Sequence, residues 1–377
     1  MKIAMVSPFP HQKNLFRGGV EAAASVLAYG LIAMARVDIH IVAPCSGRSA
    51  AMEERDGMTV HWLPTGRLPG FVGYWTSYRR SVHDLLRRIR PDITHFQAMA
   101  GWTLGYDGPY VLTIHGIAER DMSYQLGASV RMRKAIIAYV ERVGRMKSQH
   151  TILISPYVLD QLSSQIPGKR YLIENPVDSD AFDVKRTCQD GRVLFVGRVN
   201  KRKNVDGLIA AFALVKGMYA QATLRIVGES DNASYLNRCK QLVDAHGLHG
   251  SVHFIGKADR TMVLNELSQA ACLVLVSRQE TAPIIVEEAM AAQIPVVASR
   301  LCGLPYLIED ARTGFLVDPA ISQQIAENIQ LVLSNANIAS AMGKRAREIA
   351  LARFHPHAVA GRTLQLYHEV LNERASS

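Results

Sequence analysis

Short runs of apolar residues alternate along this chain with longer stretches in which apolar residues recur every three or four positions. The short runs are typical of buried strands and the longer ones of amphipathic helices, so their alternation predicts βαβ units and a parallel sheet. The strands predicted in the first half are Ile3–Val6, Asp38–Val42, Thr59–Leu63, Ile93–Phe96, Val111–Ile114, Thr151–Ile154 and Tyr171–Ile173.

The same pattern begins again after a polar, turn-rich segment at Glu174–Asp180, which we interpret as a linker. The strands predicted in the second half are Arg192–Val196, Thr223–Val227, Val252–Ile255, Cys272–Val276, Pro295–Ala298 and Gly314–Val317. We therefore expect a first domain over residues 1–174, a linker over 175–189 and a second domain over 190–355. In tandem α/β domains of this kind, ligands bind beyond the carboxyl ends of the strands, and we expect a cleft there.

The length of 377 residues agrees with two domains, because single cores rarely grow so large. We find no apolar stretch long enough to span a membrane, and we interpret the amino-terminal apolar run as a first strand rather than a signal peptide. The five cysteines are scattered without a CxxC pair, which supports neither a zinc site nor a disulfide framework. A reducing, cytoplasmic location fits this pattern best.

The net charge is +10, and most of the excess lies in the first half. A basic surface indicates an anionic partner such as phosphate, acidic lipid or nucleic acid, although a solvated surface explains the same charge. Two helical stretches are rich in cations, Tyr78–Arg90 and the region from Arg131 to Lys147. Basic amphipathic helices bind anionic lipid, so a peripheral position at the inner face of the membrane is a hypothesis. No RRM, KH or zinc-finger pattern supports a nucleic-acid partner.

Four segments at predicted strand ends carry candidate chemistry. The first is Gly18-Gly19, where a helix opens after the first strand. Two glycines let backbone amides approach a phosphate at a helix N-terminus, but a flexible turn gives the same spelling. No GxGxxG follows any strand, which disfavours a nicotinamide or flavin enzyme.

The second segment runs from Gly197 to Asn204 and holds four cations, including Arg198 and Lys203. Arginine offers a bidentate fork and lysine a point charge, both suited to a diphosphate beside a helix N-terminus. A solvated basic loop is the alternative.

The third segment follows the strand at Cys272–Val276 and contains Glu280 and Glu288 on either side of Pro283. Proline suits the first turn of a helix, so one carboxylate precedes that helix and the other lies within it. Two carboxylates so placed can bind sugar and ribose hydroxyls of one long ligand. A capped helix with surface glutamates is the alternative.

The fourth candidate is His115, at the carboxyl end of Val111–Ile114. It is suited to hydrogen bonding with a sugar or to proton transfer, or it is a structural histidine in a turn. The DxD-like Asp178-Ser179-Asp180 follows a turn and lacks an evident third ligand, so we assign it to the linker and expect no metal site.

Together these residues resemble the family-4 glycosyltransferases of GT-B fold. The resemblance covers nearly the whole chain, through Gly18-Gly19-Val20-Glu21, His115, Asn175-Pro176-Val177-Asp178, Arg198 with Lys203, Gly228, and Glu280 with Glu288-Ala289-Met290-Ala291. It implies an α/β fold of GT-B architecture, in which two Rossmann-like parallel-sheet domains face each other across a cleft. It also implies that the terminal helix, 356–372, completes the first domain.

The resemblance implies a retaining enzyme that moves a hexosyl-type sugar from a UDP- or GDP-sugar to a saccharide or lipid-linked acceptor, without metal or prosthetic group. It implies that the first domain binds the acceptor and the second the donor, in the synthesis of a cell-surface polysaccharide or glycolipid. The implied donor-binding residues are Gly18, Gly19, Arg198, Lys203, Glu280, Ala282, Ile284 and Glu288, with Arg198, Lys203, Glu280 and His115 in catalytic roles.

Two departures from the family pattern stand out. Thr281-Ala282-Pro283 replaces the frequent Gly-Phe-Gly, and Pro283 has no N–H to offer a sugar. Pro176 replaces the common glycine after Asn175, which is expected to stiffen the hinge. A sugar-nucleotide epimerase of the same fold and a non-catalytic sugar-nucleotide or lipid-binding module remain as alternative functions.

Overall fold

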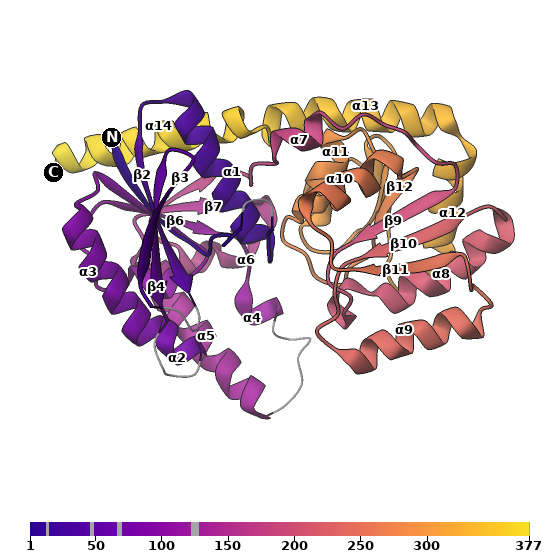
Figure 1. The fold of residues 1–377 in the computed structure, drawn as a ribbon, viewed down its shortest axis with the longest axis horizontal. Helices are drawn as coiled ribbons and strands as arrows, with labels where there is room; N and C mark the ends of the chain where they lie inside the picture. Colours follow the sequence, from indigo (N-terminus) through magenta and orange to yellow (C-terminus); the bar gives the residue numbers. More distant parts are fainter. Residues whose placement is uncertain (13–14, 46–48, 66–69, 122–127, 377) are drawn as a thin grey trace. The chain divides into compact units, whose positions relative to one another are not determined.

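The computed structural model describes residues 1–12, 15–45, 49–65, 70–121 and 128–376. They form two compact units (Figure 1). The first unit comprises Met1–Pro176 together with Pro356–Ser377, and the second comprises Val177–His355. The first unit is therefore built from both ends of the sequence, while the second is continuous.

An eight-stranded sheet forms the centre of the first unit, in the order β3-β4-β2-β1-β5-β6-β7-β8. Its strands are β1 (Lys2–Val6), β2 (Asp38–Cys45), β3 (Ala51–Arg55), β4 (Met58–Pro64), β5 (Ile93–Gln97), β6 (Tyr110–Ile114), β7 (His150–Leu153) and β8 (Lys169–Leu172). All neighbours pair in parallel except β3, which is antiparallel to β4. The strands β2 and β4 lie on one side of β1, and β5 to β8 lie on its other side. The strand order therefore reverses between β1 and β5, and the gap between them is a topological switch point.

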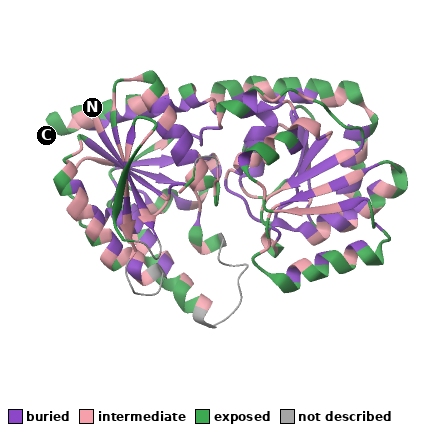
Figure 2. Cartoon of the chain, in the orientation of Figure 1, coloured by how far each residue is buried: buried purple, intermediate pink, exposed green. Residues whose placement is uncertain are grey.

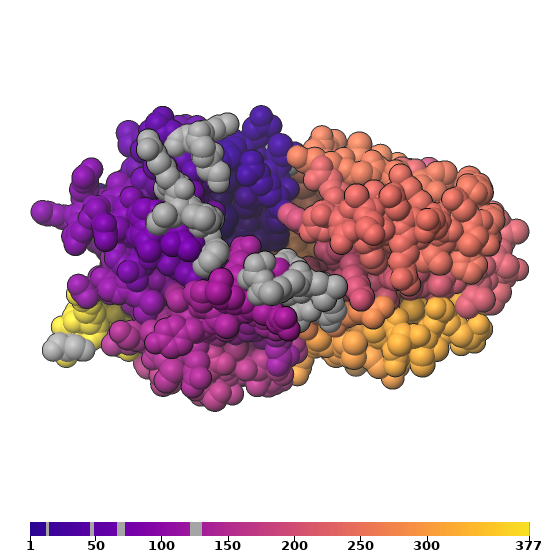
Figure 3. Space-filling view, turned by 90° about the horizontal axis from the view of Figure 1, so that it is seen from below, coloured from indigo at the N-terminus to yellow at the C-terminus, as the bar shows by residue number. Residues whose placement is uncertain are grey.

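The helices of the first unit follow the strands. They are α1 (Gly19–Met34), α2 (Gly70–Gly73), α3 (Arg79–Ile89), α4 (Ala118–Asp121), α5 (Ala128–Lys147), α6 (Pro156–Leu162) and α14 (Pro356–Ala375), with a π-helical turn, η1 (Tyr74–Tyr78), before α3. Helix α14 packs against α1 and buries Val359, Leu366, Tyr367 and Val370 in the core of this unit. Figure 3 shows the yellow atoms of the C-terminal segment beside the purple and magenta atoms of the same unit.

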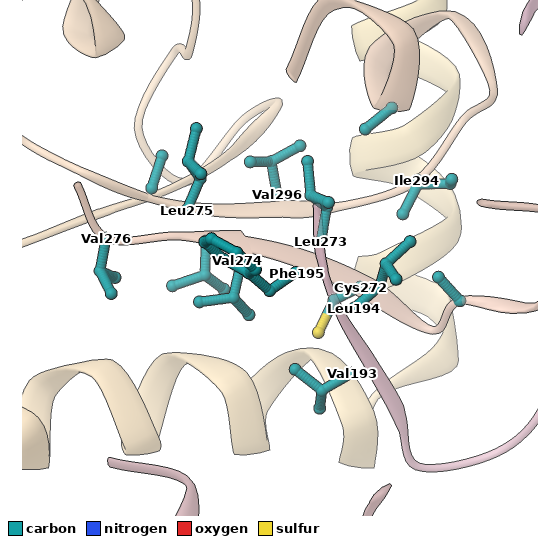
Figure 4. Packing of buried hydrophobic residues seen from close by; sticks show 14 of the residues in the cluster. Val193, Leu194, Phe195, Cys272, Leu273, Val274, Leu275, Val276, Ile294 and Val296 are labelled. Carbon is teal, nitrogen blue, oxygen red and sulfur yellow. The ribbon is translucent and has the colours of Figure 1, made fainter. Parts of the chain in front are cut away.

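The second unit holds a fully parallel six-stranded sheet in the order β11-β10-β9-β12-β13-β14. Its strands are β9 (Arg192–Val196), β10 (Thr223–Val227), β11 (Val252–Gly256), β12 (Cys272–Leu275), β13 (Val296–Ser299) and β14 (Gly314–Val317). Its helices are α7 (Ser179–Phe182), α8 (Val205–Met218), α9 (Ala233–Ala245), α10 (Arg260–Gln269), α11 (Ile284–Ala291), α12 (Ser322–Ser334) and α13 (Ala336–Arg353). The central strands are apolar on both faces, as Figure 4 shows for β9 and β12.

Among the strands of the described residues, β3 is the one that the sequence pattern did not predict. Its residues, Ala51–Arg55, are mostly exposed and polar, and Figure 2 shows this strand in green. It lies at the edge of the sheet, where no core face imposes alternation. The first sheet is thus not wholly parallel, whereas every predicted strand lies in a sheet within a few residues of its predicted bounds.

No helix in the described part of the chain is long and apolar enough to cross a bilayer. Among the same residues, no group of three or more His, Cys, Asp or Glu side chains has a geometry that could hold a metal ion.

Candidate functional site

In the second sheet, β9, β10 and β11 follow one another toward one edge, and β12, β13 and β14 follow one another toward the other edge. The strand order therefore reverses between β9 and β12, which are adjacent and parallel. Ligands of open α/β sheets bind at such a switch point, beyond the carboxyl ends of the strands. The loop after β9 carries Arg198 and Lys203, and the segment after β12 carries Glu280. The strand order therefore brings two sequence-predicted segments, about eighty residues apart, to one edge of the sheet.

Two glycines let the ends of β9 and β10 approach closely. Gly197 and Gly228 have φ values of 150° and 135°, which other residues rarely adopt. A Cβ atom on Gly228 would meet the carbonyl oxygen of Gly197 at 2.0 Å. The turn that directs the loop after β9 thus depends on glycine at both positions.

Lys203 is held at the base of this loop by a short 3₁₀ turn, Lys201–Lys203. The side chain of Asn200 caps the turn by accepting a hydrogen bond from the amide of Lys203 at 3.1 Å. Asn204 follows in the left-handed region, at φ 56°, and its side chain donates to the carbonyl of Pro319. The lysine side chain is consequently buried, and its ammonium group lies against Gly197.

The carboxylate of Glu280 is the partner of this lysine. The Nζ atom of Lys203 lies 2.6 Å from Oε1 of Glu280, and a guanidinium nitrogen of Arg202 lies 3.4 Å from Oε2. Burial by itself raises the pKa of Glu280, but the charges of Lys203 and Arg202 outweigh it and hold the pKa below its ordinary value. The result is a buried, ionised carboxylate flanked by two cations.

Arg198 lies differently from Lys203. Its side chain is 59% exposed and its guanidinium group is 3.4 Å from the carboxylate of Asp231. An exposed pair of this kind is weak and is exchanged at little cost for another anion. Arg198 is thus accessible to a ligand, and its role at a diphosphate stays a prediction.

Helix α11 begins after Pro283, which occupies the N-cap position rather than the first helical turn. Ala282 and Ile284 flank this proline and are half-buried. A proline at the cap provides no N–H, so the amides that open the helix belong to the residues after it. Thr281, just upstream, packs closely against Gly303. A Cβ atom on Gly303 would lie 1.7 Å from the carbonyl oxygen of Thr281, so only glycine permits this contact.

Glu288 lies in α11 and is 7% exposed. Its Oε1 atom accepts a hydrogen bond from Nη1 of Arg260, the first residue of α10. Burial raises the pKa of Glu288; Arg260 opposes this rise, and Asp178 adds to it. The neighbouring Glu287 is completely buried, so of the two only Glu288 keeps some exposure.

In the first unit, Gly18 and Gly19 open helix α1 after the loop that follows β1. Both are exposed, and a Cβ atom on Gly18 would meet no atom within 4 Å. Among the described residues the space beside Gly18 is therefore open, and an anionic group at this helix N-terminus stays a prediction.

His115 lies at the end of β6 with both ring nitrogens engaged. Nδ1 is 2.9 Å from the Asn175 side-chain amide, and Nε2 is 2.8 Å from that of Gln97. Burial lowers its pKa to about 4, against a smaller opposing effect of the hydrogen bond to Asn175. A neutral imidazole donates through one nitrogen and accepts through the other, so one of the amides presents its NH₂ group to the ring.

A cavity of about 20 Å³ lies beside this histidine and is lined by residues of the first unit, including Gln97, Thr113 and Asn175. It has room for roughly one water molecule. His95 lies on the same cavity and is hydrogen-bonded to Tyr367 of α14 at 2.7 Å and to Thr113 at 2.6 Å. The setting of His115 is therefore a polar network inside the unit, and proton transfer by its ring would require one amide to leave.

Several residues of these sites were not predicted as functional from the sequence. Gln97 is the last residue of β5, and Arg260 is the first residue of α10. A polar residue at the end of an element can indicate a functional site, but neither residue belongs to a recognisable motif. Asp178 was assigned to a linker. The structure makes it the N-cap of α7, where its side chain accepts a hydrogen bond from the amide of Asp180 at 3.2 Å.

Two protein families match this chain in succession. The family "Glycosyltransferase Family 4" matches residues 17–181, and the family "Glycosyl transferases group 1" matches residues 178–349. The matches follow one another with little overlap, the first over most of the first unit and the second over most of the second unit.

Relatives of established name include a glycogen synthase of Mycobacterium tuberculosis (strain CDC 1551 / Oshkosh). It is 28% identical over 298 residues, which cover 74% of this chain and 69% of the relative. A D-inositol 3-phosphate glycosyltransferase of Arthrobacter sp. (strain FB24) is 24% identical over 404 residues, covering 98% of this chain and 94% of the relative.

Solved structures show the same fold. A sucrose-phosphate synthase from Thermosynechococcus elongatus superimposes with a TM-score of 0.83 at 24% identity, over the full length of both chains. Anabaena Alr3699/HepE, in complex with UDP-glucose, has a TM-score of 0.72 at 18% identity, covering 99% of this chain and 100% of that one. Both units thus have the GT-B arrangement of strands and helices.

Proposed function

This chain belongs to the group 1 glycosyltransferases of family 4, and we propose that it moves a hexosyl-type sugar from a nucleoside diphosphate sugar to a saccharide or lipid-linked acceptor. UDP-sugars are the favoured donors, since the similar HepE structure contains UDP-glucose. We further propose that the second unit binds the donor and the first unit binds the acceptor.

The observation that carries this proposal is the buried contact between Lys203 and Glu280 at the switch point of the second sheet. Lys203 and Arg202 both lie within 3.4 Å of the Glu280 carboxylate, and Arg198 precedes them in the same loop. Cations suit the diphosphate, and the carboxylate suits sugar hydroxyls, which donate hydrogen bonds to it. Glu288, in the next helix, is proposed to bind the ribose diol.

Cleavage of a sugar–diphosphate bond develops negative charge on the leaving diphosphate. Lys203 and Arg198 are proposed to stabilise that charge, and groups fixed before the reaction do so without reorganisation cost. We propose that the anomeric configuration of the sugar is retained and that the leaving phosphate takes the proton of the acceptor hydroxyl. His115 is neutral and both of its ring nitrogens are hydrogen-bonded, so it removes no proton in this proposal, and it contacts a sugar hydroxyl only if one amide gives way.

A peripheral attachment to anionic membrane is proposed for the first unit through α5. Met132, Ile136, Tyr139 and Met146 are exposed and recur at helical spacing, so they form one apolar stripe. Arg131, Arg142 and Lys147 are exposed around it. An apolar stripe bordered by cations is complementary to acidic lipid headgroups and acyl chains. Arg145 is excluded from this surface, because it is buried against Glu119.

The function is tested by incubating the purified protein with UDP-, GDP- and ADP-sugars, with and without candidate glycan or lipid-linked acceptors. Glycosylated product that appears only with acceptor, with the anomeric configuration of the donor by NMR, is the expected result. An altered sugar nucleotide formed without acceptor would instead establish the epimerase alternative. Inverted product would remove the retaining assignment.

A further inference from the structure

Arg260 is a buried cation that the proposed function does not yet use. It is the first residue of α10, after β11, and the side chain of Asp259 caps this helix by accepting from the amide of Met262 at 2.8 Å. The Arg260 side chain is 7% exposed. Its location is fixed from both sides, by the helix start and by the carboxylate of Glu288.

The guanidinium group is only partly satisfied. Nη1 donates to Oε1 of Glu288, whereas Nε and Nη2 are buried without a hydrogen-bond partner among the described residues. Buried donors without acceptors are rare in folded proteins, because each loses its hydrogen bonds to water without replacement. Two such donors on one arginine, beside a carboxylate, indicate a ligand that brings an acceptor oxygen.

The carboxylate and the arginine set complementary demands on that ligand. Glu288 accepts hydrogen bonds, and Arg260 only donates them. The ligand must therefore present hydroxyl donors to Glu288 and, close to them, an acceptor oxygen to Arg260. A pyrimidine nucleoside does so, because its ribose carries a diol and the base carries a carbonyl oxygen next to the sugar.

We propose that Arg260 holds Glu288 toward the ribose diol and donates through Nε and Nη2 to the base carbonyl of a pyrimidine nucleotide such as UDP. This inference rests on the proposed function and adds the residue that selects the base. Guanine presents a ring-nitrogen acceptor on the side facing the sugar, with an amino donor beside it that opposes an arginine. Adenine offers only a ring nitrogen there, which cannot take both N–H groups of the fork.

The experiment is calorimetric titration of UDP, ADP and GDP into the wild-type protein and three variants. Arg260→Met removes both the charge and the fork, and Arg260→Lys keeps the charge alone. The matched control is Arg192→Met, which also breaks a buried pair, with Glu266 at 2.7 Å, at the other end of β9. Thermal melts without nucleotide verify that every variant is folded.

We expect the wild-type protein to bind UDP more tightly than ADP or GDP. Arg260→Met should weaken UDP binding roughly tenfold to hundredfold and abolish the preference for UDP. Arg260→Lys should recover part of the affinity, because it restores the charge beside Glu288, but not the preference. Arg192→Met should bind all three nucleotides as the wild type does.

Two results would overturn the inference, and they are distinguishable. If the wild type binds none of the nucleotides, the proposed function fails and the inference fails with it. If the wild type binds UDP but both Arg260 variants keep its affinity and preference, the nucleotide site stands and the role of Arg260 is wrong. Should Arg260→Met prove unfolded, the Arg260→Lys comparison decides alone, through the ratio of UDP to ADP affinity.

Discussion

The charged side chains of the second unit differ sharply in how deeply they are buried. Lys203 and Glu280 contact each other inside the unit, while Arg198, five residues before Lys203, lies at the surface with Asp231. A buried pair that loses one partner leaves an uncompensated charge, whereas an exposed pair loses little. The two cations of the same loop are therefore expected to respond differently to substitution.

Replacing Lys203 by alanine is expected to reduce turnover by at least ~10²-fold, because a preorganised donor to the leaving group is lost. Lys201→Ala, an exposed lysine of the same loop, is the matched control and should retain wild-type turnover. Steady-state assays with the best donor check this. A folded Lys203→Ala enzyme with wild-type kcat would refute the proposed role.

The pH dependence of stability is expected to reflect His115. Its pKa is about 4 in the folded protein and 6.5 in the unfolded chain, so the unfolded state binds the proton first as pH falls. The stabilisation is present above pH 6.5 and is lost between 6.5 and 4. At pH 5 the loss amounts to about 2 kcal/mol.

Urea titrations at pH 7.5 and 5.0 measure this effect. Since His115→Gln cannot titrate, its unfolding midpoint should fall less between the two pH values than that of the wild type. The other histidines are common to both proteins. Burial, and to a smaller extent His115, lower the pKa of His95 to about 3, so His95 contributes little difference between these pH values. An equal fall in both proteins would mean that His115 does not resist protonation.

At the scale of elements, the sequence predicted the strands well because central strands of parallel sheets are apolar on both faces. It missed β3, whose exposed polar residues at the sheet edge carry no such signal. It also predicted the segments around Arg198 and Glu280 from their positions after strands. It could not predict Arg260, since the pairing with Glu288 joins the start of α10 to the middle of α11, which only the folded unit brings together.

Close packing between segments offers a test at this scale. In Gly303→Ala, the new methyl group would lie 1.7 Å from the carbonyl oxygen of Thr281, so the segment next to Glu280 must shift. We expect destabilisation of about 1–3 kcal/mol and weaker nucleotide binding. Denaturant melts and titration with UDP measure both.

Gly217→Ala is the control for this substitution. Gly217 lies in α8, where a Cβ atom would meet nothing within 4 Å, and alanine is the better helix former. This variant should be as stable as the wild type or up to about 1 kcal/mol more stable. If Gly303→Ala behaved in the same way, the segment around Thr281 would be less constrained than its packing indicates.

For the whole molecule, net charge and the α5 stripe lead to an expectation about membranes. The protein should co-float with anionic liposomes at low salt and less at high salt, because salt screens the cationic contribution. The double variant Met132→Glu with Tyr139→Glu should lose most of this binding. Leu351→Glu, an exposed apolar residue of the second unit, is the control. Absence of co-flotation at low salt would remove the membrane hypothesis.

Helix α14 gives the chain a definite order of completion during synthesis. The first unit needs the buried side chains of this helix, yet the ribosome makes the whole second unit before it. The second unit can consequently fold while the first still exposes the apolar surface that α14 later covers. Nascent chains are thus vulnerable in their earliest-made part, and chaperones that shield apolar surface would be expected to act there until α14 emerges.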